Sequence, residues 1–287
     1  MNYRHAFHAG NFADVLKHAL LARCLLHLNA KAAPYRVIDT HAGLGLYDLS
    51  GDAPSRTVEW RQGIGRLITE PVPYDSAVLL QPYLQAIEKM RAFHGPNAYP
   101  GSPELARQMT RGEDRMIFVE KHPVDAKALK ENFAFDGRAK VMERDGYEAL
   151  KACVPPKERR GLVLIDPPFE ERDEFERLFS GFFAAYAKWP TGTYLMWYPI
   201  KDEAETRRFH RALAESGIAK ILCVELRVKA DEAATGLAAT GMILVNPPWT
   251  LMTELQTLMP FLDQRLAQGA GNAWRAHWLA GDSVQPR

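Results

Sequence analysis

The sequence predicts an α/β fold: a mostly parallel seven-stranded sheet with an antiparallel last strand and a small helical insertion. From about residue 115 onward, short apolar runs alternate with segments of helical periodicity, as in parallel sheets built from right-handed crossovers. The last two apolar runs, 219–228 and 241–246, leave no room for a helix between them, so they should pair antiparallel. Residues 51–98 contain few β-branched runs and are punctuated by prolines, which indicates helices.

The first predicted helix begins after Asn11, which can cap it. Val15, Ala19, Ala22 and Leu26 form one apolar face at three- and four-residue spacing. The other elements follow from the same patterns and are, in order: strand 35–39, glycine-bearing loop 40–49, helices near 58–68 and 77–93, helix 103–110, strand 115–120, helix 125–136, strand 139–145, helix 146–153, strand 161–166, helix 174–189, strand 192–199, helix 203–217, strands 219–228 and 241–246, and helix 253–266.

This order divides the chain into three parts. Residues 1–50 form an N-terminal motif, the first helix, the first strand and the glycine loop of the main domain. Residues 51–98 form a helical insertion subdomain, and residues 99–287 complete the main domain.

Composition excludes several classes of protein. No apolar run approaches the roughly 20 residues that span a bilayer, and the start lacks the apolar core and cleavage site of a signal peptide. Cys24, Cys153 and Cys223 lie far apart and form no Cys-x-x-Cys pair, so neither disulfides nor a structural zinc is expected. We therefore expect a cytoplasmic protein with no membrane contact.

The charge is unevenly distributed although the formal net charge is only +1. Residues 1–38 contain five Lys or Arg residues and a single acidic residue, Asp14. This excess could be a solvated helix face or a phosphate-binding surface, and charge alone does not separate the two.

Four successive strands of the predicted sheet end in polar or small residues, at the edge where open parallel sheets bind ligands. These are Asp39, His41, Gly43 and Gly45 at the first strand, Glu120 at the second, Asp145 and Gly146 at the third, and Asp166, Pro167, Pro168 and Phe169 at the fourth. Singly, each could be a tight turn or a helix cap. Together, the first three suit a nucleoside cofactor, with acids for ribose hydroxyls and an adenine amino group, and glycines for close backbone approach.

The fourth strand end, D-P-P-F, suits a substrate amine. This series resembles the S-adenosylmethionine-dependent amino-methyltransferases, whose fourth motif is [DNS]-P-P-[YFW], and the sheet layout is that of class I (Rossmann-like) methyltransferases. Asp166 and a carbonyl of the Pro-Pro segment can accept both hydrogens of an exocyclic amine, so that its lone pair faces the methyl group. Phe169 can stack on an extruded base. Positioning and electrostatics then carry the reaction, with no metal and no covalent intermediate.

A closer resemblance extends over essentially the whole chain. The segments YRHAFHAGNFADVLKH, DTHAGLGLYDL, YPGSPELARQ, GLVLIDPPFE and ATGMILVNPPW resemble the bacterial 23S ribosomal RNA adenine-N6 methyltransferase RlmJ family. The resemblance implies a catalytic role for Asp166 and contacts to S-adenosylmethionine from His18, His41, Ser102, Glu120, Asp145, Gly146 and Asp166. It places Tyr3 near the RNA substrate, and His5, Lys17, Pro167 and Phe169 are assigned to RNA with it.

The implied partner is 23S ribosomal RNA, with no obligate protein partner evident. Phe169 departs from the tyrosine usual in the family, which preserves stacking and loses only a hydroxyl contact. Ser102 could instead be an N-cap of the following helix.

Three other functions compete with this interpretation. A DNA adenine methyltransferase would use the same chemistry, but the chain has no large separate region for target recognition. A nicotinamide-dependent oxidoreductase would leave D-P-P-F unexplained, and the first loop lacks G-x-G-x-x-G spacing. A non-catalytic RNA-binding module would not need polar and small residues suited to a cofactor at the ends of four successive strands.

A second motif, Asn246-Pro247-Pro248-Trp249, repeats the chemistry of the first. Because its strand should run antiparallel, we expect Asn246 at the opposite edge of the sheet. The prolines would then end the strand and start a helix, with Trp249 packing against the protein.

Overall fold

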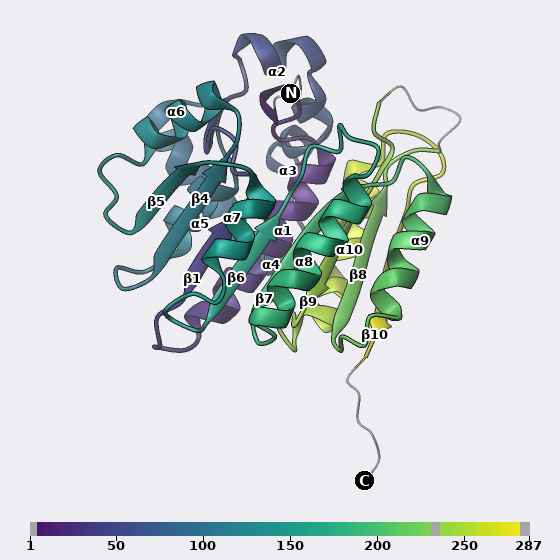
Figure 1. Cartoon of the computed structure of the whole chain (residues 1–287). Coiled ribbons are helices and arrows are strands. Elements are labelled where there is room, and N and C mark those ends of the chain that lie inside the picture. The colour runs from purple at the N-terminus through teal and green to yellow at the C-terminus, as the bar shows by residue number, and fades with distance from the viewer. Residues whose placement is uncertain (1–4, 231–235, 282–287) are drawn as a thin grey trace.

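The computed structural model describes residues 5–230 and 236–281 as an α/β fold (Figure 1). The strands are β1 (Arg36–Asp39), β2 (Leu46–Asp48), β3 (Ala98–Pro100), β4 (Arg115–Glu120), β5 (Ala139–Glu143), β6 (Gly161–Ile165), β7 (Thr193–Pro199), β8 (Ile221–Arg227), β9 (Ala239–Val245) and β10 (Ala273–Ala280). The helices are η1 (His5–Phe7), α1 (Phe12–Asn29), α2 (Asp52–Thr57), η2 (Glu59–Gln62), α3 (Ile64–Thr69), α4 (Tyr74–His94), α5 (Ser102–Met109), α6 (Pro123–Asn132), α7 (Gly146–Cys153), α8 (Glu174–Lys188), α9 (Glu203–Ala214) and α10 (Leu251–Leu266).

The main sheet has the strand order β10-β8-β9-β7-β6-β1-β4-β5. The five strands from β7 to β5 are parallel, and β9 runs antiparallel between β7 and β8. This confirms the predicted mostly parallel sheet with an antiparallel closing strand. Since β1 lies between β4 and β6, the carboxyl ends of β1, β4, β5 and β6 gather at one edge.

The predicted strand number of seven was wrong, because β10 adds an eighth strand. It pairs antiparallel with β8, with Arg275 opposite Glu225. As an edge strand it is largely exposed and includes Arg275 and His277, so it lacks the continuous apolar run by which buried strands are recognised.

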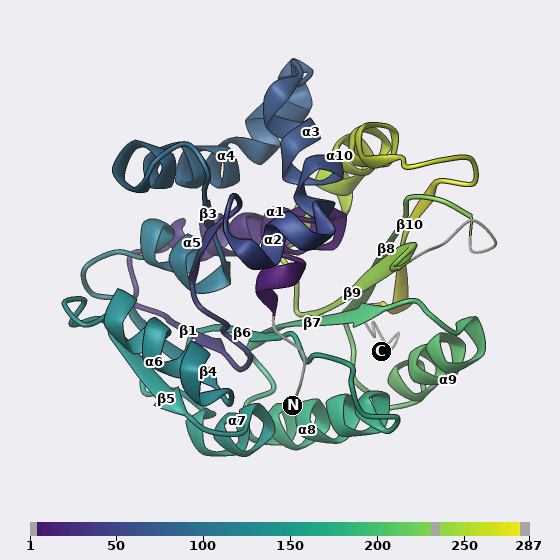
Figure 2. The same ribbon diagram turned by 90° about the horizontal axis from the view of Figure 1, so that it is seen from above.

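Helices cover both faces of the sheet, as the view from above shows (Figure 2). Side chains of α7, α8 and α9 pack on one face, and those of α1, α5 and α10 pack on the other. Each face of the sheet therefore has its own apolar core. The edge at the carboxyl ends of the parallel strands is available for ligands.

Helix α1 is buried on nearly all sides rather than along one stripe. Fourteen of its residues are buried, because α4, α5 and α10 surround the part of α1 that the sheet does not cover. Val15, Ala19 and Ala22 are in the core as expected, whereas Leu26 is 41% exposed. The predicted single apolar face is thus too narrow a description of this helix.

A short two-stranded ribbon, in which β2 pairs antiparallel with β3, connects to α2, η2, α3 and α4. Tyr47 lies opposite Tyr99 in this ribbon. The treatment of residues 51–98 as a subdomain stays a proposal.

None of the helices in the described part of the chain is long and apolar enough to cross a membrane.

Candidate functional site

A cavity of about 420 Å³ opens where the carboxyl ends of β1, β4, β5 and β6 meet. Acidic side chains dominate its lining, which includes Glu120, Asp145, Asp166, Glu171 and Glu174. A cavity of this character suits a ligand rich in hydroxyl, amino and cationic groups.

Glu120, the last residue of β4, is fixed by two backbone hydrogen bonds. The N–H of Gly43 donates to Oε2 at 2.8 Å, and the N–H of His122 donates to Oε1 at 2.7 Å. Burial raises the pKa of Glu120 in spite of these two bonds. Each carboxylate oxygen retains a further lone pair with which it can accept a ligand hydroxyl.

Gly43 is in the left-handed region at φ +60°, and a Cβ there would lie 2.3 Å from the hydroxyl oxygen of Tyr47. A side chain is therefore excluded on both conformational and steric grounds. The first glycine of the loop is required to bring its N–H onto Glu120.

Asp145 caps α7 by accepting from the N–H groups of Tyr147 and Glu148. Its Oδ2 lies 3.0 Å from Nζ of Lys121. Burial opposes ionisation, but the hydrogen bond from Lys121 and the backbone bonds outweigh it and lower the pKa of Asp145. Asp145 is therefore an ionised acceptor beside the cavity.

Gly146 lets α7 approach the loop after β1. A Cβ on Gly146 would lie 2.3 Å from the carbonyl oxygen of Thr40 and 2.8 Å from Cε1 of His41. Burial lowers the pKa of His41 to about 4, so its ring is neutral at neutral pH.

Asp166 directly follows β6 and is bound by Lys17 of α1. The Lys17 Nζ lies 2.5 Å from Oδ2 of Asp166 and 2.8 Å from Oδ1 of Asp14. Burial favours the neutral amine, but Asp14 and Asp166 hold the pKa of Lys17 well above its ordinary value. Lys17 is therefore a buried cation shared by two carboxylates.

A second cavity, of about 620 Å³, lies on the other side of Asp166. Its lining includes Phe169, Trp197 and Lys201, and it shares His5, Asp166, Pro168 and Glu170 with the first cavity. The Phe169 ring meets Trp197 edge-on, with centroids 5.7 Å apart. Asp166 thus stands between an acidic cavity and one with aromatic walls.

Five of the seven residues predicted to contact a cofactor line the first cavity: His41, Glu120, Asp145, Gly146 and Asp166. Ser102 and His18 do not. Ser102 begins α5 and its hydroxyl donates to Oδ2 of Asp39 at 2.6 Å. Burial, together with the nearby Asp166, raises the pKa of Asp39 to about 6 although the Ser102 bond acts to lower it.

His18 lies behind the site, in a cluster of buried tyrosines. Its Nδ1 is 2.8 Å from the hydroxyl of Tyr99, which in turn contacts the hydroxyl of Tyr83. Burial lowers the pKa of His18 to about 3. The structure therefore does not support a direct cofactor contact from His18. Its neutral ring packs in the core.

The residues predicted to contact RNA are placed differently from one another. Tyr3 lies outside the described residues. His5 and Phe169 line the second cavity, while Pro167 is buried. Lys17 also lines the second cavity, but it is 3% exposed and its ammonium binds two carboxylates, so its assignment to RNA stays a prediction.

Two of the cations in the N-terminal excess of positive charge are paired with acids from distant parts of the chain. Arg23 binds Glu254 through two hydrogen bonds of 2.8 Å, and Arg36 binds Glu158 at 2.9 Å. These side chains therefore form neither a solvated face nor an open phosphate-binding surface.

Asp14 and Trp197 are site residues that sequence reasoning missed. Asp14 carries a detectable signal, because it precedes Lys17 by three residues on a predicted helix and is the single acid of that stretch. Trp197 carries none, since its approach to Phe169 depends on the pairing of β6 with β7.

The second proline motif lies at the opposite edge of the sheet, as predicted. Val245, which precedes Asn246, pairs with Tyr194 and Ile221 near the starts of β7 and β8. The Asn246 amide donates to the carbonyls of Pro190 and Gly192 at 2.9 and 2.8 Å. The expected packing of Trp249 was wrong, because this side chain is 84% exposed.

Comparison with known proteins gives a consistent result. A family model described as "Ribosomal RNA large subunit methyltransferase D, RlmJ" matches residues 32–280. Two curated proteins named "Ribosomal RNA large subunit methyltransferase J" are each 39% identical to the chain. The Haemophilus influenzae protein aligns over 97% of this chain and 99% of its own length. The Escherichia coli protein aligns over 95% and 97%.

A solved structure shares the fold over the same extent. The crystal structure of a Legionella pneumophila protein is 32% identical in sequence and superimposes with a TM-score of 0.86. The alignment covers 96% of this chain and 99% of the Legionella protein.

Proposed function

Because the chain belongs to the RlmJ family of ribosomal RNA large subunit methyltransferases, we propose that it methylates the exocyclic N6 of an adenine in 23S ribosomal RNA. The methyl donor in this proposal is S-adenosylmethionine. The observation that supports it best is the position of Asp166 on the wall common to an acidic and an aromatic cavity.

The first cavity has the donors and acceptors that this cofactor requires. Glu120 suits ribose hydroxyls, and Asp145 suits the amino group of the cofactor's adenine. The acidic lining also favours the positive charges of the sulfonium and the amino-acid ammonium. When bound, the cofactor supplies an electrophilic methyl group, and it requires no metal.

The second cavity suits the substrate adenine. Phe169 and Trp197 offer apolar ring faces and edges to a base taken out of its stack. The Asp166 carboxylate accepts one N–H of the exocyclic amine, and a main-chain carbonyl of the Pro167–Pro168 segment accepts the other. Both bonds turn the nitrogen lone pair toward the methyl group, and the carboxylate stabilises the positive charge that develops on nitrogen as the new bond forms.

The proposed partner is therefore 23S ribosomal RNA, and the proposed place of action is the cytoplasm. A DNA adenine methyltransferase remains the alternative, since the chemistry at Asp166 would be the same.

Methyl transfer from tritiated S-adenosylmethionine to total RNA and, separately, to DNA tests this proposal. We expect label in 23S ribosomal RNA, recovered as N6-methyladenosine after digestion, and no label with an Asp166→Ala protein. Label in DNA alone would establish the alternative, and label in neither would contradict both.

A further inference from the structure

Asp14 is a buried carboxylate close to the reaction centre that the proposed mechanism does not use. It lies on the first turn of α1 and is 1% exposed. The Lys17 ammonium bridges it to Asp166, at 2.8 Å from Asp14 and 2.5 Å from Asp166. Asp14 is therefore separated from the catalytic carboxylate by a single cation.

The backbone holds Asp14 in place. The N–H of Gly10 donates to its Oδ2 at 2.8 Å, and Nε2 of His5 lies 3.1 Å from the same oxygen. Its own N–H donates to Oδ1 of Asn11, which caps the helix. The remaining oxygen, Oδ1, faces Lys17.

The ionisation states follow from these contacts. Burial acts to raise the pKa of Asp14, but His5 and Lys17 outweigh burial and hold it well below its ordinary value. The pKa of Lys17 is held high by Asp14 and Asp166. The Lys17 ammonium is thus shared between the carboxyl groups of Asp14 and Asp166.

This sharing matters for Asp166. An ammonium paired with Asp166 alone would neutralise the carboxylate that must stabilise positive charge on the substrate nitrogen. With Asp14 as a second partner, the formal charges of Asp14, Lys17 and Asp166 sum to −1, to which His5, 3.1 Å from Asp14, adds a positive charge only when it is protonated. Lys17 also occupies only Oδ2 of Asp166, and Oδ1 has no hydrogen-bond partner within the described residues.

We infer that Asp14 is a positioning residue for methyl transfer: it draws the Lys17 ammonium partly away from Asp166, which stays negative and keeps Oδ1 free for the amine. The inference rests on the proposed function, since the amine is the proposed substrate. Asp14 does not line the cofactor cavity. It lines the second cavity together with Lys17, and it acts on the amine through Lys17 and Asp166.

The test is Asp14→Asn, which removes the charge at nearly constant shape. We expect kcat for RNA methylation to fall about 10- to 100-fold, as when a metal ligand loses the partner that orients it. KM for RNA and cofactor affinity by calorimetry should stay within about twofold of wild type. Asp14→Glu, which restores the charge, should retain more of kcat than Asp14→Asn.

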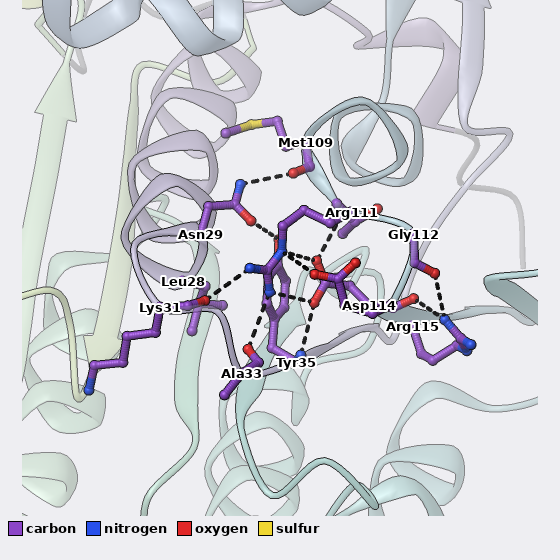
Figure 3. Close-up of polar contacts among 12 residues, drawn as sticks. Leu28, Asn29, Lys31, Ala33, Tyr35, Met109, Arg111, Gly112, Asp114 and Arg115 are labelled. Carbon is purple, nitrogen blue, oxygen red and sulfur yellow. Dashed lines mark hydrogen bonds and ion pairs between the residues drawn. The ribbon is translucent and has the colours of Figure 1, made fainter.

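Asp114→Asn is the matched control. Asp114 is likewise fully buried and paired with one cation, Arg111, and it accepts the N–H of Tyr35 (Figure 3). It precedes β4, at the opposite edge of the sheet from Glu120. This variant should lose stability and retain kcat.

A double variant decides whether Asp14 acts through Lys17. In a Lys17→Met background, Asp14→Asn should lower kcat little further, because the shared cation is already gone. All variants are compared at a temperature where circular dichroism shows each folded. Equal losses in both backgrounds, or equal losses for Asn and Glu at position 14, would overturn the inference. An inactive wild-type protein on RNA would instead count against the proposed function.

Discussion

At the scale of single residues, Asp166 and Asn246 show how strand direction separates two nearly identical motifs. Asp166 ends β6 beside the glycine loop, whereas Asn246 ends β9, which runs the other way. Asn246 has φ +53°, and its side-chain amide donates hydrogen bonds to two carbonyls of the loop before β7. Its motif is thus a strand terminus, which supports Asp166 as the proposed catalytic residue.

We therefore predict that Asp166→Ala abolishes methyl transfer without unfolding the protein. Asn246→Ala should keep transfer within about tenfold of wild type. It should lower the free energy of unfolding by roughly 1 kcal/mol, because the carbonyls of Pro190 and Gly192 lose their donor. Tritium transfer and urea unfolding on both proteins check this. A folded, inert Asn246→Ala protein beside an active Asp166→Ala protein would reverse the assignment.

Glu120 gives a second residue-scale prediction. Glu120→Ala should weaken S-adenosylmethionine binding by roughly 1–3 kcal/mol, because ribose hydroxyls lose a charged acceptor and the Gly43 N–H loses its partner. Isothermal titration calorimetry measures this directly. An unchanged affinity would remove Glu120 from the cofactor site.

At the scale of elements, the helical insertion holds the N-terminal segment against the site. Glu59 of η2 accepts from Asn11 and contacts His8, each at 3.0 Å, and the N–H of Ile64 donates to the carbonyl of Gly10 at 2.8 Å. These contacts fix the turn that leads into α1, and therefore the positions of Asp14 and Lys17.

Gly63→Ala tests this role. A Cβ on Gly63 would lie 2.1 Å from the carbonyl oxygen of Gly10, so the two segments must separate. We expect a loss of roughly 1–3 kcal/mol in unfolding free energy and a lower kcat. Gly137→Ala, whose Cβ would meet nothing within 4 Å, is the control and should change both little.

The elements also show what sequence patterns can and cannot predict. The central strands were predictable because parallel strands buried on both faces are continuous apolar runs. The acids at their ends were predictable because all these strands end at one edge. The edge strand β10 and the all-round burial of α1 were not, since both depend on which distant segments pack beside them.

At the scale of the whole molecule, buried neutral histidines make stability depend on pH. His18 has its pKa lowered from 6.5 to about 3 by burial. Below pH 6.5 the unfolded chain therefore gains a proton that the folded chain does not, and stability falls with falling pH. His41 acts in the same direction down to about pH 4, while Asp39, with its pKa raised to about 6, acts oppositely.

We predict that the slope of unfolding free energy against pH, between about 6 and 4, is smaller in His18→Gln than in wild type. The difference should be about 1.4 kcal/mol per pH unit, the value for one proton. Urea titrations at several pH values provide both slopes. Parallel slopes would show that His18 also titrates in the folded protein.

The burial of α1 also has a consequence for how the protein is made. The helix is covered by α10, and Arg23 binds Glu254, a residue 231 positions later in the chain. At ordinary rates of translation, on the order of 10 to 50 s pass between the synthesis of these two residues. During that time the apolar helix α1 is part of the nascent chain, and the surface of α10 that will cover it has not yet been made. The packing of α1 is thus completed only after α10 has been synthesised.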